Sequence, residues 1–179
     1  MNRPVKLLKH PLHPMLIVFP LGLLSGGVIF DLIAKFTGNQ GFYVVSYWMI
    51  AAGIVGGLLA AIFGFMDWLS IRSDTRAKSV GMWHGLGNLV IVLLFAASWW
   101  MRSNDSNNVP GTFAFILSLL GAGLALVTAW LGGELVYRLG MAVEQGANDN
   151  APNSLTTEIP TTGTQASPRR KQTGGRSGD

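Results

Sequence analysis

The chain contains no cysteine and little charge. With no cysteine among 179 residues, disulfides, thiolate metal ligands and cysteine nucleophiles are excluded. Charged residues make up 12% of the sequence, about half of the ~25% that is usual in soluble domains. Hydrophobic residues make up 49%. A chain with so few charges is expected to be surrounded largely by lipid rather than by water.

Signatures of common enzymes are also missing. The sequence has neither a phosphate-binding glycine loop nor an HExxH motif, and it supports no enzyme class by itself. A net charge of +4 would suggest nucleic acid as the partner of a soluble protein. Here the basic residues lie between apolar runs and in terminal segments. The expected partner is therefore a lipid bilayer, and nucleic acid is not expected.

Four long uncharged runs dominate what is present. A helix needs about 20 apolar residues to cross a bilayer. The runs predict four transmembrane helices, near residues 14–35, 43–66, 82–101 and 112–136. The alternative is a very apolar soluble bundle, which is disfavoured because soluble helices need polar faces. The predicted fold class is thus all-α, an integral membrane four-helix bundle with up-down-up-down connections.

The first run resembles a signal peptide at its start, where Arg3, Lys6 and Lys9 precede the apolar segment. No A-x-A-type cleavage site follows it, and the sequence HPLHP interrupts the usual layout. We therefore expect this helix to be retained. Pro20 lies inside it and predicts a kink, because proline removes one backbone hydrogen bond.

The distribution of lysine and arginine predicts the orientation in the membrane. Cytoplasmic connections carry an excess of these residues. One side of the predicted bundle carries Arg3, Lys6, Lys9, Arg72, Arg76, Lys78 and Arg138, and the other carries Lys35 and Arg102. We therefore expect both termini to lie in the cytoplasm.

The last part of the chain has a different composition. Residues 146–179 are rich in Asn, Thr, Ser, Gly and Pro and have almost no large apolar side chains. Such a segment cannot bury enough surface to offset the entropy lost on ordering. The sequence predicts a transmembrane domain over residues 1–145 and a disordered tail over residues 146–179.

All three histidines are predicted at one end of the bundle. Because consecutive helices alternate in direction, the starts of the first and third helices share an end with the close of the second and fourth. That end collects His10, His13, Asp67, His84, Asn88, Glu134 and Arg138. The opposite end carries Asp31, Lys35, Arg102 and Asp105, to which the sequence assigns no site.

A weak internal repeat supports this arrangement. The first helix opens with HPMLIVFPLG from His13, and the third opens with HGLGNLVIVL from His84. Each is followed by a helix that closes on an acid, in FMDW and in LGGEL. The two halves are predicted to be parallel hairpins related by an axis along the membrane normal. Diagonal neighbours in such a bundle would bring His13 and His84 to face each other across the core.

Structural roles remain open for each of these residues. His10 and His13 could serve as helix caps, since Pro14 suits a first helical position. Asp67 and Glu134 could simply pair with nearby arginines, Arg72 and Arg138. A polar residue within a span more often faces the bundle and marks a site. That argument applies best to His84, one helical turn before Asn88.

At this point the sequence resembles a known family. The segments HPLHPMLIVFPLGLL, GFMDWL, HGLGNLVIVLL and WLGGELVYRLGMAV are similar to the bacterial membrane-protein family called domain of unknown function 2231. The resemblance covers roughly residues 7–144. It implies a four-helix inner-membrane protein of unassigned activity, and it supplies neither catalytic residues nor a cofactor.

Three functions remain candidates. The first is a small redox-associated subunit that binds b-type haem through His13 and His84, or through His10 in place of His13. The second is a Zn²⁺ or Cu²⁺ site built from His10, His13 and His84 with Asp67 or Glu134. The third is a non-catalytic membrane subunit or proton-linked transporter with structural or titrating histidines. A second copy of the chain or a redox protein would be the partner in these cases.

Overall fold

A computed structural model describes residues 5–8, 10–144, 146–151 and 153–155. The chain divides into two units, Met1–Gln145 and Gly146–Asp179. Of the second unit only short turns are described, held by local bonds such as that from the Asn150 amide to Asn148 Oδ1. Most of the predicted disordered tail, residues 152 and 156–179, therefore lies outside the described residues.

The first unit is a mostly helical bundle, in agreement with the predicted fold class. Its main helices are α1 (Leu12–Leu16), α2 (Val18–Thr37), α3 (Gly41–Leu69), α4 (Arg76–Arg102) and α5 (Thr112–Gly133), and α5 continues into the π-helix η1 (Glu134–Arg138). Four stretches are long and apolar enough to cross a membrane: Leu12–Thr37, Gly41–Leu69, Arg76–Arg102 and Thr112–Arg138. The prediction of four membrane-spanning helices is confirmed.

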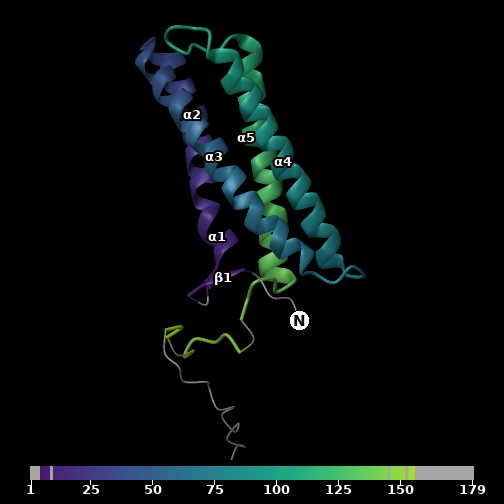
Figure 1. Cartoon of the computed structure of the whole chain (residues 1–179). Coiled ribbons are helices and arrows are strands. Elements are labelled where there is room, and N and C mark those ends of the chain that lie inside the picture. The colour runs from purple at the N-terminus through teal and green to yellow at the C-terminus, as the bar shows by residue number, and fades with distance from the viewer. Residues whose placement is uncertain (1–4, 9, 145, 152, 156–179) are drawn as a thin grey trace, which may run out of the picture. The chain divides into compact units, whose positions relative to one another are not determined.

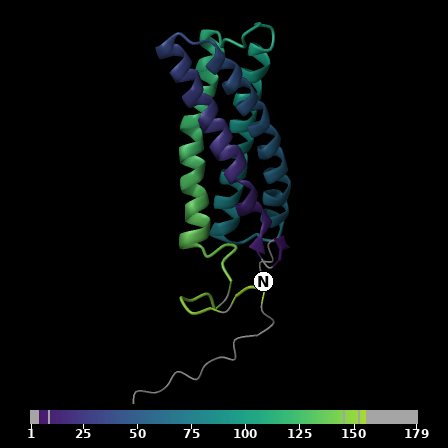
Figure 2. The same cartoon turned by 90° about the vertical axis from the view of Figure 1, so that its left-hand side faces the viewer.

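The helices form two hairpins. Helix α2 packs along α3, α4 packs along α5, and the hairpins meet mainly through α3 and α4 (Figures 1 and 2). The first and third spans are diagonal neighbours. Large apolar side chains point outward along every span, for example Ile29, Leu59, Leu93 and Leu126. Such an apolar exterior fits a lipid environment better than water.

The helix ends follow from local chemistry. Helix α2 ends at Gly38, whose φ of 72° places it in the left-handed region that glycine tolerates. Helix α4 begins earlier than predicted because the Thr75 side chain accepts a hydrogen bond from the Lys78 amide and caps the first turn. The polar segment from Arg76 therefore belongs to the helix rather than to the preceding loop.

The first span is interrupted close to Pro20. Ile17 separates α1 from α2. Pro20 has no amide hydrogen to donate to the carbonyl of Leu16, four residues earlier, so the helix is weakened at this point. Before α1, the two-residue strands β1 (Lys6–Leu7) and β2 (His10–Pro11) form an antiparallel pair.

The core has the symmetry that the internal repeat predicts. A cluster of Leu24, Val28, Ile50, Ile91 and Phe95 fills the centre of the bundle. A Cβ on Gly53 would lie 2.7 Å from the Leu24 side chain, and a Cβ on Gly121 would lie 2.8 Å from Phe95. Leu24 and Phe95 are 71 residues apart, and Gly53 and Gly121 are 68 apart. Each hairpin thus packs its first helix onto a glycine of its second at equivalent positions.

Candidate functional site

The paired histidines lie at the end of the bundle where both chain halves begin. His13 comes from α1 and His84 from α4, with ring centres 6.3 Å apart and ring planes at 89° to each other. Diagonal helices therefore bring two residues 71 positions apart into contact. We call these two side chains the histidine pair.

The His13 ring is fixed by α3. Its Nδ1 lies 2.9 Å from the carbonyl oxygen of Ala60. A Cβ on Gly64, one helical turn further along α3, would lie only 2.8 Å from atoms of this ring. Glycine at position 64 therefore makes the space that the imidazole occupies.

The His84 ring is fixed by α5 in the same way. Its Nδ1 lies 2.9 Å from the carbonyl oxygen of Thr128. A Cβ on Gly132, again one turn further, would lie 3.1 Å from the ring. Ala60 and Thr128, like Gly64 and Gly132, are 68 residues apart. The two histidine environments are thus equivalent in the two hairpins.

These contacts determine which ring nitrogen carries hydrogen. A carbonyl oxygen only accepts hydrogen bonds, so Nδ1 of each histidine must be the donor. The neutral imidazole then has its lone pair on Nε2. In both rings, therefore, Nε2 is the nitrogen that can bind a metal or accept a proton.

The symmetry breaks at Asn88, which is one turn along α4 from His84. Its Nδ2 lies 3.2 Å from His84 Nε2 and also donates to the His84 carbonyl at 2.8 Å. The Thr128 hydroxyl donates to Asn88 Oδ1 at 3.3 Å. The equivalent of Asn88 in the first hairpin is Ile17, 71 residues earlier, which carries no polar group. The polar network therefore surrounds only His84.

The other predicted ligands do not join the histidine pair. His10 is exposed, and its Nδ1 contacts the carbonyl of Leu8 at 3.1 Å. Among the described residues, no group of three or more His, Asp or Glu side chains is placed to hold a metal ion. The capping role considered for His13 is not found either, because helix α1 begins with Pro11 as its cap residue and has no side-chain cap.

The two carboxylates at this end have other partners. Asp67 Oδ1 accepts a hydrogen bond from the Val5 amide at 2.7 Å and so holds the N-terminal segment. Glu134 pairs with Arg76 of α4 at 2.6 Å. The described contacts thus replace the pairs with Arg72 and Arg138 that the sequence spacing suggested. Glu134 also begins the π-helix η1, a type of segment that is frequent at functional sites.

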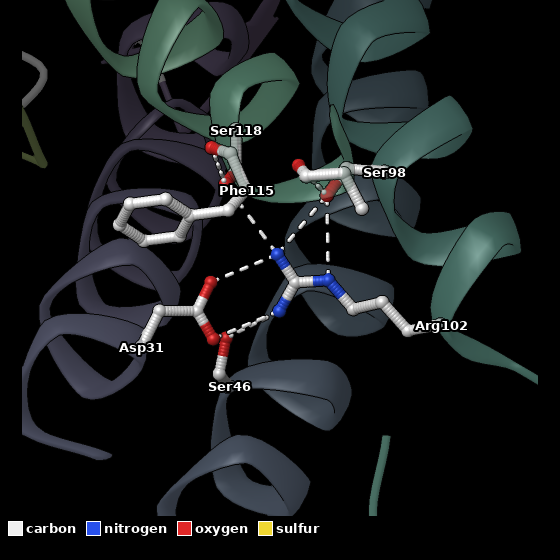
Figure 3. Close-up of polar contacts among 7 residues, drawn as sticks. Asp31, Ser46, Ser98, Arg102, Phe115 and Ser118 are labelled. Atoms are coloured by element: carbon white, nitrogen blue, oxygen red, sulfur yellow. Dashed lines mark hydrogen bonds and ion pairs between the residues drawn. The ribbon is translucent and has the colours of Figure 1, made fainter. Parts of the chain in front are cut away.

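A second polar centre, which the sequence did not predict, lies toward the opposite end of the bundle. Arg102 and Asp31 are both fully buried and form a two-pronged ion pair, with Nη1 to Oδ1 and Nη2 to Oδ2 each at 2.8 Å (Figure 3). Hydroxyl groups of three serines accept the remaining hydrogen bonds of the guanidinium: Ser46, Ser98 and Ser118.

The internal repeat of the sequence indicates that these two charged residues occupy equivalent positions. Asp31 follows His13 by 18 residues, and Arg102 follows His84 by the same number. At a rise of about 1.5 Å per residue, the ion pair and the histidine pair are about 27 Å apart along the helices. Extending the repeat beyond its opening residues would have placed the two charges opposite each other.

Comparison with known proteins now identifies the family. A family model described as "Predicted membrane protein (DUF2231)" matches residues 9–145. The chain belongs to the DUF2231 family. This agrees with the resemblance seen in the sequence, and the family description and the apolar helices together support a membrane location. No curated protein and no solved structure matches this DUF2231 protein.

Proposed function

We propose that this DUF2231 protein is a small redox-associated membrane subunit that binds b-type haem between His13 and His84. The observation that carries the proposal is the histidine pair itself. Both Nδ1 atoms are 2.9 Å from backbone carbonyls, which leaves both Nε2 atoms as the basic nitrogens. Histidines that bind metals are usually held in this manner through the other ring nitrogen.

The separation of the two rings suits a single iron. Two bonds of about 2 Å, with about 1.1 Å from each Nε2 to its ring centre, place the centres of two opposed imidazole ligands roughly 6.2 Å apart. In the structure the two ring centres are 6.3 Å apart. The distance between the ring centres is therefore compatible with both imidazoles binding one metal ion.

The number of donors favours haem over a protein-only metal site. Zinc sites use three or four protein ligands. Here Asp67 is bonded to the Val5 amide and Glu134 to Arg76, which leaves two imidazoles. A porphyrin supplies four nitrogen ligands itself and needs only axial ligands from the protein.

Asn88 would have to release His84 when the site is filled. Its Nδ2 would keep the bond to the His84 carbonyl, and the Thr128 hydroxyl would keep its second acceptor, the carbonyl of Ala125, at 3.1 Å. The Asn88 amide and the Thr128 hydroxyl thus each keep one acceptor for their hydrogens.

The alternative, a proton-linked transporter or non-catalytic subunit, has less support from the core. The residues between the histidine pair and the Asp31–Arg102 pair are the apolar cluster of Leu24, Val28, Ile50, Ile91 and Phe95. Charges and protons cross an apolar region poorly, because apolar side chains do not replace their hydration. An electron carrier needs no such path for ions.

The test is the visible spectrum of the protein purified from cells supplied with haem precursor. We expect a Soret band and at least ten-fold less bound haem after His13→Ala or His84→Ala. The matched control is His10→Ala, which removes an exposed histidine near the same end and should leave the band unchanged. A parent protein without a Soret band would refute haem binding, and bound zinc or copper in its place would favour the metal site.

A further inference from the structure

The buried ion pair joins equivalent positions of the two hairpins. Asp31 lies on the first helix of hairpin one and Arg102 on the first helix of hairpin two, 71 residues later. The same interval separates His13 from His84 and Leu24 from Phe95. Two residues related in this way meet at the axis that relates the hairpins, so each hairpin presents its residue to its counterpart.

The hydroxyl groups around the ion pair suit the arginine on the second hairpin and have no equivalents around Asp31. Ser98 and Ser118 accept hydrogen bonds from Arg102, and Ser46 accepts another (Figure 3). The equivalents of Ser98 and Ser118 around Asp31 are Gly27 and Ile50, which have no hydroxyl group. The two hairpins therefore place these residues at equivalent backbone positions, but the side chains at the two positions carry opposite charges.

We propose that Asp31 and Arg102 select the pairing of the two hairpins. A hairpin carrying Asp31 finds a compatible partner only in a hairpin carrying Arg102. If two copies of hairpin one met in this geometry, two carboxylates would face each other in a region where an unpaired buried charge is strongly unfavourable. The partner recognised by the Asp31 face is thus the Arg102 hairpin, and the ion pair sets their register.

This role is independent of haem. The pair lies about 27 Å along the helices from the histidine pair, and all five hydrogens of the guanidinium have acceptors nearby. Buried ionic groups are best known for fixing register and partner choice. A chain can therefore need this pair for assembly whether or not it binds a cofactor.

The test uses the full chain with one engineered disulfide as a reporter. A Cβ on Gly57 of α3 would lie 3.2 Å from Val92 Cγ2 of α4. The variant Gly57→Cys with Val92→Cys should therefore form a disulfide between the hairpins, and because the chain has no other cysteine the yield is unambiguous. This background serves as the parent for every variant below.

Reversal of one charge should break the pairing. Arg102→Asp places two acids at the axis, Asp31→Arg places two bases there, and each should reduce the disulfide yield at least ten-fold. The matched control is Asp74→Arg, which creates a like-charged pair with Arg72, an exposed partner 3.2 Å away in the parent. This control should retain the yield, because exposed charges are solvated.

Reversal of both charges should restore the pairing once equivalent serines are added around the new arginine. The restoring variant combines Asp31→Arg and Arg102→Asp with Gly27→Ser, Ile50→Ser and Ala114→Ser, which rebuilds the three hydroxyl positions around the other hairpin. Ile50→Ser also makes room, since a Cβ on Gly27 would lie 2.7 Å from Ile50 Cγ1. We expect at least half of the parental disulfide yield.

Two results would overturn the proposal. One is a parental yield in either single reversal, which would show that complementary charge is not needed. The other is a restoring variant that performs no better than the single reversals, which would show that position rather than complementarity matters. Neither result depends on whether the parent binds haem.

Discussion

At the residue scale, two glycines determine where the imidazoles lie. Gly64 and Gly132 are one turn beyond the carbonyls that bind His13 and His84, and the rings occupy the space where a Cβ would be. Larger residues at these positions would push each ring away from its carbonyl. The glycines therefore support the site without contributing a ligand.

If the histidine pair binds haem as proposed, Gly64→Ala should weaken that binding by displacing the His13 ring. A Cβ there would approach ring atoms to 2.8 Å, and overpacking of this kind costs about 1–3 kcal/mol. Haem affinity measured by titration should fall roughly 5- to 150-fold. Gly85→Ala is the control, because a Cβ at that position meets nothing within 4 Å. Equal affinities for the two variants would show that His13 does not need this space.

At the scale of elements, the hairpin is the unit that repeats. Each hairpin supplies one histidine, one carbonyl acceptor, one ring-accommodating glycine and one buried charge, in the same order. Most side chains differ between the hairpins, and the differences at the histidine pair include Asn88 in place of Ile17 and Thr128 in place of Ala60. Duplicated backbone geometry thus carries two polar centres whose chemistry has diverged.

The C-terminal segment is expected to contribute little to the helices. Deletion of residues 146–179 removes almost no large apolar side chains, so the free energy of unfolding should stay within about 0.5 kcal/mol, as for exposed surface changes. Circular dichroism and thermal unfolding in detergent provide the measurement. A marked drop in the unfolding temperature would show that this segment packs against other parts of the protein.

At the scale of the whole molecule, orientation decides which compartment reaches the histidine pair. The lysine and arginine bias favours a cytoplasmic location for both termini, and the histidine pair lies at the same end of the bundle as the start of α1. We therefore propose that the site faces the cytoplasm in an inner membrane. A redox partner would then approach from that side.

Reporter fusions test this orientation. A reporter that works only in the cytoplasm should be active when it is fused after Asp179. A reporter that works only in the periplasm should be active when it is inserted between α2 and α3, at Gly38–Gln40. Transferring lysine and arginine residues to the connections at the other end of the bundle should invert the topology, because positively charged connections resist translocation. A periplasmic signal from the C-terminal fusion would place the histidine pair at the outer surface instead.

The extent of the spans and the end at which the histidines gather were determined by the sequence. Both depend on local properties, since about 20 apolar residues are needed to cross a bilayer and consecutive spans must alternate in direction. The start of α4 was placed six residues late, at 82 rather than Arg76. The capping contact of Thr75 is a local feature, but the apolar run alone does not reveal it.

Only the tertiary structure decided which charged side chains pair. When every face of a helix is apolar, hydrophobic periodicity does not fix the rotation of the helix about its axis. That rotation brings Arg102 to Asp31, 71 residues away, and Arg76 to Glu134, 58 residues away. It also turns His13 toward His84, a contact that the internal repeat predicts, while leaving His10 exposed. Partner choice in this bundle is a property of helix packing, because contacts so distant in sequence leave no local pattern.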